Sequence, residues 1–337
     1  MLILARESRG QNQMEMAKML GIMPTNLSKI ERGDFSISPD SLTKFANITN
    51  YPLSFFYQQG DIVPENLNYR KREKVAQKLL TPIHARVNII RYHVQLLTRA
   101  LNIEKGGILN FTDTGYESPV ATAQKLRKVW NIKTSVIDNL TELLEKKGIV
   151  ISNCNFGTER VDSRSVLTDD KHPVIILNDL LLGDRQRFSL AYQFGHLIMH
   201  TLNAVDSKRD VAHEANVFAA EFLMPEKEII EDFKDGVTIA LLGELKRKWK
   251  VSMIALLYRA DDLGLLTPNQ KRYLLQQFNE LKIRRREPVE LDIPIEKPKL
   301  IRQWLAQLKS EKKLDTKAAA ERIHLNVDEF IELYIPE

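Results

Sequence analysis

Side chains between residues 187 and 200 have the types and nearly the spacing of a metal-dependent hydrolytic site. A helix that carries His at positions i and i+4, with Glu beside the first His, can bind zinc and activate a water molecule. Here the second His is present as His196, but Tyr192 stands in the first His position and Gln193 in that of Glu. Gln cannot accept a proton as a carboxylate does, and neutral Tyr is a poor zinc ligand. The pattern therefore predicts a site that has lost its hydrolytic chemistry.

Length and composition indicate a globular protein of two or three domains. The chain has 337 residues, of which 43% are hydrophobic and 28% charged, and these values allow sizeable cores. The net charge of +5 permits a polyanionic partner without requiring one. A single cysteine, Cys154, excludes an internal disulfide framework. We expect a cytoplasmic protein without a membrane partner, because no signal peptide or apolar span is recognisable.

The first 57 residues have the pattern of short helices separated by tight turns. Residues 13–20 carry apolar side chains at helical spacing, and Gly21 ends that helix. Pro24 begins a second helix, Gly33 stops it, and a third starts near Pro39. Two short helices joined through a glycine turn form the helix-turn-helix unit, whose second helix enters the DNA major groove.

This segment resembles the Xre/Cro family of repressor DNA-binding domains. The matching residues are Arg6, Gln13, Glu15, Ala17, Leu20, Gly21, Ile22, Leu27, Ser28, Lys29, Ile30, Glu31, Arg32, Gly33, Ser38 and Pro39. The resemblance implies that the second helix reads bases and that neighbouring residues grip phosphate. The base-contact candidates are Thr25, Ser28 and Lys29, and the phosphate-contact candidates are Arg6, Gln13 and Arg32. A small helical bundle used for protein contact is the alternative.

Residues 69–99 form a strongly basic stretch after this module, with Glu73 as its single acid. The cations are Arg70, Lys71, Arg72, Lys74, Lys78, Arg86, Arg91 and Arg99. We interpret residues 70–102 as one or two connecting helices that follow a linker containing Pro64. Their positive side chains either form a solvated face or follow the phosphates of bound DNA.

The remaining patterns predict helices around a small sheet. Short apolar runs at 149–151 and 173–178 are typical of strands, with a further strand near 165–167. Helices are expected at 118–130, 136–147, 183–202 and 212–224, and two or three more at 299–335. The predicted fold class is mostly α with a small sheet: an all-α helix-turn-helix bundle, a helical connector, an α+β core and C-terminal helices.

From Ser118 to about Pro294 the chain resembles the ImmA/IrrE family of metallopeptidases, whose core is zincin-like. The matching blocks include Leu177-Asn178, Gly183 to Ala191, Phe194-Gly195-His196, Glu214 to Pro225 and Leu263-Gly264. In that family zinc is held by the two His of H-E-x-x-H and by an acid from the following helix. By position His196 is the remaining His ligand and Glu214 the remaining acid, and this implies a degenerate site.

Two alternatives for this site remain open. His200 lies one helical turn beyond His196, so a rescued zinc site of His196, His200 and Glu214 is conceivable, and His213 is a further candidate. Otherwise His196 and Glu214 only hydrogen-bond to each other or to Tyr192 in a polar pocket. We expect no catalytic residue and no cofactor, with zinc present only if the site is rescued.

The predicted domains and functions follow from the two resemblances. The domains are 1–58 helix-turn-helix, 59–147 linker and helical connector, 148–235 zincin-like core, 236–290 helical extension, and 291–337 linker and C-terminal helices. We expect a DNA-binding regulator, a repressor or antitoxin, whose peptidase-like domain senses a signal or binds a partner. Its expected partners are an operator duplex, a second copy of the chain, and a cognate toxin or effector. The alternatives are an active zinc metallopeptidase that cleaves a repressor, and an interaction protein that no longer binds DNA.

Overall fold

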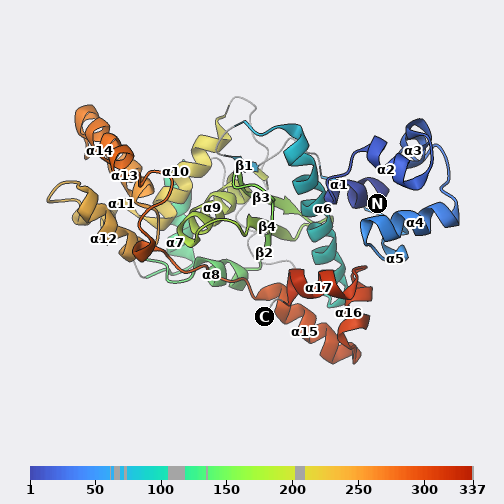
Figure 1. Cartoon of the computed structure of the whole chain (residues 1–337). Helices are drawn as coiled ribbons and strands as arrows, with labels where there is room; N and C mark the ends of the chain where they lie inside the picture. The colour runs from blue at the N-terminus through green and yellow to red at the C-terminus, as the bar shows by residue number, and fades with distance from the viewer. Residues whose placement is uncertain are drawn as a thin grey trace.

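The protein is mostly helical and is built around one small sheet (Figure 1). The computed structural model describes residues 1–60, 62–63, 69–71, 74–104, 118–133, 136–201 and 209–335. The predicted fold class is confirmed: a helical N-terminal bundle, a long connecting helix, an α+β core and C-terminal helices. In these described ranges no helix combines the length and apolar character that a bilayer crossing requires.

The N-terminal bundle forms where the pattern of short helices predicts it. Its helices are α1 (Leu2–Ser8), α2 (Gln13–Leu20), α3 (Pro24–Glu31), α4 (Pro39–Thr49) and α5 (Leu53–Phe56). Asn12 and Glu15 form a reciprocal capping box at the start of α2. Gly21 ends α2 with a φ of 75°, a left-handed conformation that glycine adopts without a steric penalty. These local signals fix the turn between α2 and α3.

The connector differs from the expected helix over residues 70–102. Residues Tyr69–Lys71 form a strand, β1, and the helix α6 runs from Gln77 to Ala100. Pairing of β1 with the distant strand β3 (Val161–Leu167) gives these residues their extended form, and local sequence carries no sign of that pairing. The break expected at Gly106-Gly107 lies outside the described residues.

The sheet is mixed and has the order β1-β3-β4-β2. Strand β2 (Val150–Cys154) pairs parallel with β4 (Pro173–Asn178), and β3 pairs antiparallel with β4. The three strands expected in this region are confirmed. Strand β1 was not expected, and it pairs antiparallel with β3 at the edge of the sheet.

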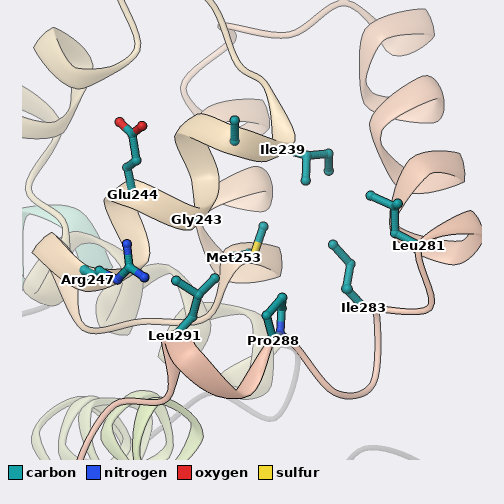
Figure 2. Close-up of a pocket in the computed structure, with 10 residues that line it drawn as sticks. Ile239, Gly243, Glu244, Arg247, Met253, Leu281, Ile283, Pro288 and Leu291 are labelled. Atoms are coloured by element: carbon teal, nitrogen blue, oxygen red, sulfur yellow. The ribbon is translucent and has the colours of Figure 1, made fainter.

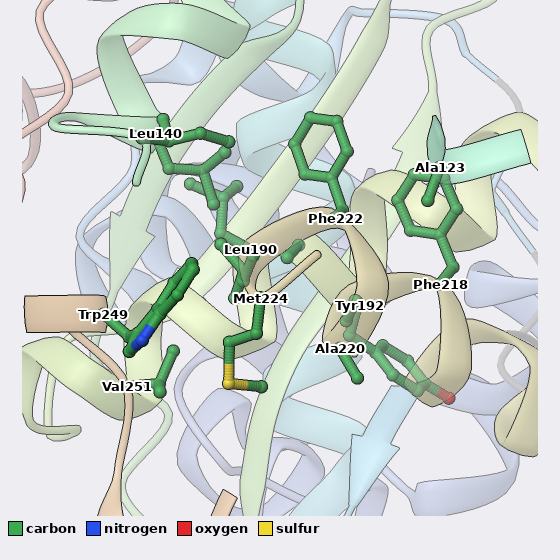
Figure 3. Close-up of a cluster of buried hydrophobic side chains, with 14 of the residues drawn as sticks. Ala123, Leu140, Leu190, Tyr192, Phe218, Ala220, Phe222, Met224, Trp249 and Val251 are labelled. Atoms are coloured by element: carbon green, nitrogen blue, oxygen red, sulfur yellow. The ribbon is translucent and has the colours of Figure 1, made fainter. Parts of the chain in front are cut away.

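The two faces of the sheet support separate apolar cores, because side chains alternate along each strand. Ile151 and Ile175 belong to a cluster that includes apolar residues of helix α9 (Gly183–His196), which we call the α9-side cluster (Figure 3). Val150 and Val174 belong to a second cluster, the α6-side cluster. That cluster also contains apolar residues of the N-terminal bundle, of α6 and of the C-terminal helices.

Helices cover both faces. On the α9 side lie α7 (Pro119–Val129), α8 (Leu140–Lys146), α9 (Gly183–His196), the π-helical turn η2 (Leu197–Thr201), α10 (Val211–Leu223) and α11 (Glu226–Asp232). Beyond them are α12 (Ile239–Trp249), α13 (Met253–Asp262), α14 (Pro268–Glu280) and the short 3-10 turn η3 (Val289–Leu291). The C-terminal helices are α15 (Leu300–Lys312), α16 (Thr316–Arg322) and α17 (Val327–Tyr334). The helix expected over 136–147 begins only at Leu140, where Asn139 caps it.

The segment between η3 and α15 is extended, as expected, and is fixed to the core by buried charges. Glu296 accepts a hydrogen bond from the guanidinium of Arg187 and another from the backbone N–H of Thr141 at 2.8 Å. Just before η3, Glu287 shares the buried ammonium of Lys246 with Asp184, at 2.6 Å from each carboxylate. The α12 helix and this segment are thereby attached to the start of α9.

Candidate functional site

The helix α3 presents one polar face to solvent. Thr25, Lys29 and Arg32 are exposed, Ser28 is half-buried, and Leu27 anchors the opposite side in the bundle core. Their spacing of three to four residues places the four polar side chains on successive turns of one face. The structure therefore brings together the three base-contact candidates and Arg32.

Two of these cations also have internal partners. The ammonium of Lys29 lies 4.9 Å from the ring centroid of Phe35, and Arg32 forms an exposed ion pair with Asp34 at 3.2 Å. An exposed pair of this kind contributes about 0–1 kcal/mol. Both cations can therefore exchange these contacts for DNA at little cost.

Arg6 does not lie on this surface, so its expected role in phosphate contact is corrected. Its side chain is 6% exposed, and its Nε donates to the Oε1 of Glu31 at 2.6 Å. A second guanidinium nitrogen donates to Oε2 of Glu31 at 3.0 Å, and the amide of Gln13 donates to the same oxygen at 2.7 Å. The side chain of Glu31 is 1% exposed. Arg6 and Gln13 therefore hold α1, α2 and α3 together around one buried carboxylate.

Arg86 and Arg91 of α6 make contacts within the protein, which neither the solvated face nor the phosphate-following face expected from the sequence predicts. Arg86 donates to the carbonyl oxygens of Ser8 at 3.1 Å and Asn155 at 2.6 Å. Arg91 donates to the carbonyl of Leu167 at 2.6 Å. Arg72 and Glu73, part of the same basic run, lie outside the described residues.

The second candidate site lies along α9, where Tyr192 is 5% exposed. The ring of Tyr192 lies in the α9-side cluster and approaches His196 edge-to-face, with ring centroids 6.4 Å apart. Burial raises the pKa of its phenol, although the nearby Arg70 guanidinium opposes that rise. Tyr192 is therefore a neutral, packed residue at neutral pH.

Gln193 is completely buried and turned toward β3. Its side-chain oxygen accepts a hydrogen bond from the hydroxyl of Ser165 at 2.7 Å, and its amide nitrogen donates to the carbonyl of Ser163 at 3.1 Å. A carboxylate in this position could accept from Ser165 but could not donate to Ser163. The amide thus fits its surroundings better than the glutamate of a hydrolytic motif.

His196, His200 and Glu214 are brought close together. The rings of His196 and His200 are 4.8 Å apart, and Nε2 of His200 lies 2.9 Å from Oε2 of Glu214. His200 lies on the π-helical turn that continues α9 to Thr201; the expected end at Leu202 is outside the described residues. His213 is exposed near the start of α10.

A cation that sequence reasoning missed completes this group. The guanidinium of Arg209 donates to both carboxylate oxygens of Glu214, to Oε1 at 2.9 Å. These hydrogen bonds lower the pKa of Glu214, whereas burial lowers the pKa of His196 to about 4 and also lowers that of His200. At neutral pH the group consists of two neutral imidazoles and one carboxylate paired with Arg209.

This donor set fits a zinc ion poorly. Zinc at Glu214 would meet the positive charge of Arg209, which already bonds to both carboxylate oxygens. A ligating His usually donates its other ring N–H to a fixed partner. Among the described residues, Nδ1 of His196 and Nδ1 of His200 are buried without such a partner. The geometry instead gives a hydrogen-bonded group in which His200 bonds to Glu214.

A separate open cavity of about 390 Å³ lies between α12, η3 and the residues after α14 (Figure 2). Its lining is mostly apolar and includes Met253, Ile283 and Leu291, with Glu244 and Arg247 also contributing. None of the sequence-predicted site residues lines it.

Comparison with known proteins identifies both parts of the chain. Residues 2–56 match a family described as Helix-turn-helix, and residues 144–261 match one described as IrrE N-terminal-like domain. The chain therefore carries an Xre-type helix-turn-helix domain and an IrrE/ImmA-like domain.

One curated relative is similar to a portion of the chain. The Radiation response metalloprotease IrrE of Deinococcus radiodurans is 36% identical over 107 residues, which cover 27% of this chain and 31% of that protein. The chain thus spans less than a third of that relative's length.

Proposed function

We propose that this protein is a DNA-binding transcriptional regulator, a repressor or antitoxin, whose IrrE-like domain binds a signal or a partner protein instead of hydrolysing peptides. The helix-turn-helix match and the exposed face of α3 support DNA binding. We also propose that two copies bind a two-fold operator, because a single small module buries too little surface for tight binding.

The observation that carries the loss of catalysis is the bonding of Gln193. With its amide satisfied by Ser163 and Ser165, Gln193 is neither a base nor directed at His196. Tyr192 in the other motif position is packed and neutral. A hydrolytic zinc site needs three protein ligands and a base for its water. We propose that the region around Tyr192, His196, His200 and Glu214 is a binding site whose occupation alters DNA affinity.

DNA binding can be tested with a duplex selected from a randomised pool. We expect Lys29→Ala to relax discrimination among selected sequences, at a cost of about 1–3 kcal/mol for the preferred one. We expect Arg32→Ala to weaken all sequences alike and to reduce the salt slope by about one. Titrations by fluorescence anisotropy at several salt concentrations measure both effects.

The matched control is Lys317→Ala, which removes an exposed lysine of α16. It should bind the selected duplex like the wild-type protein. Failure of the selection to enrich any sequence, together with unchanged binding by both α3 variants, would show that this module does not read DNA.

The Gln193→Glu variant tests whether restoring the motif's glutamate destabilises the fold and whether it restores peptide hydrolysis. The new carboxylate loses the donor to Ser163 and is buried, so we expect unfolding to become easier by about 1–3 kcal/mol. We expect no peptide hydrolysis to appear. Urea unfolding and a casein-cleavage assay with added zinc measure the two outcomes.

Gln303→Glu, the same change on the exposed face of α15, is the control and should leave stability unchanged. A stable Gln193→Glu protein that cleaves casein would mean that the site is only one substitution from activity.

An active metallopeptidase that cleaves a repressor is the second candidate. It is favoured by the closeness of His196, His200 and Glu214, the three ligands of a rescued zinc site, and by the name of the Deinococcus relative. Elemental analysis decides between the two: one zinc per chain, lost on His196→Ala, and chelator-sensitive proteolysis would support the enzyme.

A further inference from the structure

Helices α16 and α17 form a second helix-turn-helix unit. The turn after α16 contains His324 with a φ of 59°, and the turn after α2 contains Gly21 with a φ of 75°. The residues that begin the next helix also match, with φ −71° and ψ 150° at Asn326 before α17 and φ −73° and ψ 142° at Met23 before α3. The backbone path from α16 to α17 therefore follows the path from α2 to α3.

The hydrogen bonds and the buried side chains of the two units correspond at a constant spacing along the chain. The N–H of Leu325 donates to the carbonyl of Ala320 at 3.0 Å, and the N–H of Ile22 donates to that of Ala17 at 3.0 Å. The corresponding buried residues are Ala17 and Ala320, Leu20 and Ile323, and Leu27 and Phe330. Residues 316–334 lie outside both matched families, so this correspondence comes from the structure and not from those matches.

The second helix of this unit, α17, differs from α3 in charge. The counterparts of Thr25 and Lys29 are Asp328 and Glu332, and both carboxylates are exposed. Ile331 lies on the same face, because three and four residues separate the side chains of one helical face, and it is 41% exposed. We call these three residues of α17 the acidic face. DNA affinity comes largely from Lys and Arg that neutralise phosphates, so the acidic face is unsuited to reading DNA.

Contacts on another side of α17 fix the position of the acidic face. Arg9 of the N-terminal bundle forms an ion pair with Glu329, and Asn326 donates to the carbonyl of Asn50 at 3.1 Å. The acidic face and the polar face of α3 are both exposed in one chain, so neither covers the other. Helices α3 and α17 lie apart on the molecule (Figure 1).

The polar face of α3 complements the acidic face. It presents the exposed cations Lys29 and Arg32. Exposed apolar side chains lie before and after the helix, Met23 at 66% and Phe35 at 53% exposure, and Ile331 offers an apolar side chain to such a surface. Faces of opposite charge attract each other and orient the approach of two proteins. A second copy of this chain therefore carries a surface that fits the acidic face.

We propose that the acidic face of one copy of this protein docks on α3 of a second copy and covers the surface that reads DNA. Asp328 and Glu332 then take the place of DNA phosphates and pair with Lys29 and Arg32. Such a contact joins two unlike surfaces, so it is heterologous. Copies that are free of DNA associate through it, and an operator competes with it. The inference rests on the proposed role of α3 in DNA binding, and it names a second copy as the partner of α17.

Sedimentation velocity of the full-length protein without DNA measures this association. We expect wild-type copies to associate at low salt and to separate at high salt, because salt screens the charges. The variant Asp328→Lys/Glu332→Lys loses the acidic face, and Lys29→Glu/Arg32→Glu loses the cations of α3. Each variant alone should associate about tenfold more weakly than wild type, or more weakly still. A mixture of the two should associate again, because one variant retains α3 and the other retains the acidic face.

The matched control is Glu231→Lys/Glu311→Lys, which makes the same change of net charge at exposed positions of α11 and α15. It should associate like wild type. The proposal is overturned if the acidic-face variant also associates like wild type, or if the mixture of the two folded variants does not associate.

Cross-linking of the wild-type protein gives a readout that does not depend on any variant folding. A carbodiimide joins the amine of Lys directly to the carboxylate of Asp or Glu. In a mixture of isotope-labelled and unlabelled copies, we expect it to join Lys29 of one copy to Asp328 or Glu332 of the other. Absence of this cross-link at low salt would contradict the proposal. Neither measurement uses DNA, so a failure to bind an operator is recognised separately.

Discussion

We expect Arg6→Ala to lose about 3–5 kcal/mol of folding stability, as do variants that leave one partner of a buried ion pair unpaired. The side chain of Glu31 is 1% exposed and bonds to Arg6 through both carboxylate oxygens. Without Arg6 the carboxylate keeps only the amide of Gln13 among these contacts. The N-terminal bundle should then unfold, and DNA binding should be lost with it. Urea unfolding followed by circular dichroism measures the stability.

The double variant Arg6→Ala/Glu31→Gln separates this explanation from a direct DNA contact. Removing the charge of residue 31 should recover part of the stability and part of the DNA binding. Arg32→Ala, by contrast, should fold normally. If Arg6→Ala were as stable as wild type and reduced only the salt slope, Arg6 would contact phosphate after all.

We expect acid to destabilise the protein steeply below pH 6.5. Burial lowers the pKa of His84 and of His196 to about 4 and that of His93 to about 3. In the unfolded chain these groups return toward 6.5, so between pH 6.5 and about 4 the unfolded state binds protons that the folded state does not. The folding stability that these three His contribute is therefore fully present above pH 6.5. It falls as pH decreases, by about 1.4 kcal/mol per pH unit for each His.

The variant His93→Asn tests the contribution of His93 to this pH dependence of folding stability. Nδ1 of His93 lies 2.7 Å from the hydroxyl of Tyr334, and the Asn side chain can preserve a hydrogen bond there without titrating. Urea unfolding at a series of pH values should show a slope between pH 6 and 4.5 that is smaller than that of the wild-type protein by about 1.4 kcal/mol per pH unit. The same slope in both proteins would mean that His93 does not titrate with unfolding.

Local patterns predicted those parts of the fold that local physics determines. Gly21 and Ser118 mark helix ends in the sequence, and in the structure Gly21 ends α2 and Ser118 caps α7. The three strands expected around 149–178 are present because their β-branched residues are buried on both faces of the sheet.

What the sequence did not predict depends on contacts between distant residues. Arg6 matched the expected DNA-binding pattern, but its partner lies 25 residues away in α3. Arg70 was expected in a basic connecting helix, and in the structure it belongs to a strand that pairs with β3. Arg209 was passed over because nothing near it in sequence indicates that it pairs with Glu214. In each case the sequence alone did not show which residue the charged side chain contacts in the folded protein.

The contact between the N-terminal bundle and α17 has a consequence for how the protein is made. Arg9 donates to both carboxylate oxygens of Glu329, 320 residues further along the chain, and Asn326 donates to the carbonyl of Asn50 at 3.1 Å. During translation at about 5–20 residues per second, this docking surface emerges roughly 15–60 seconds after the bundle. A nascent chain therefore exposes α3 on the ribosome before the C-terminal helices that contact the N-terminal bundle have been synthesised. Pulse-labelled, stalled chains that end before residue 300 should carry a bundle that is folded less stably than in the finished protein.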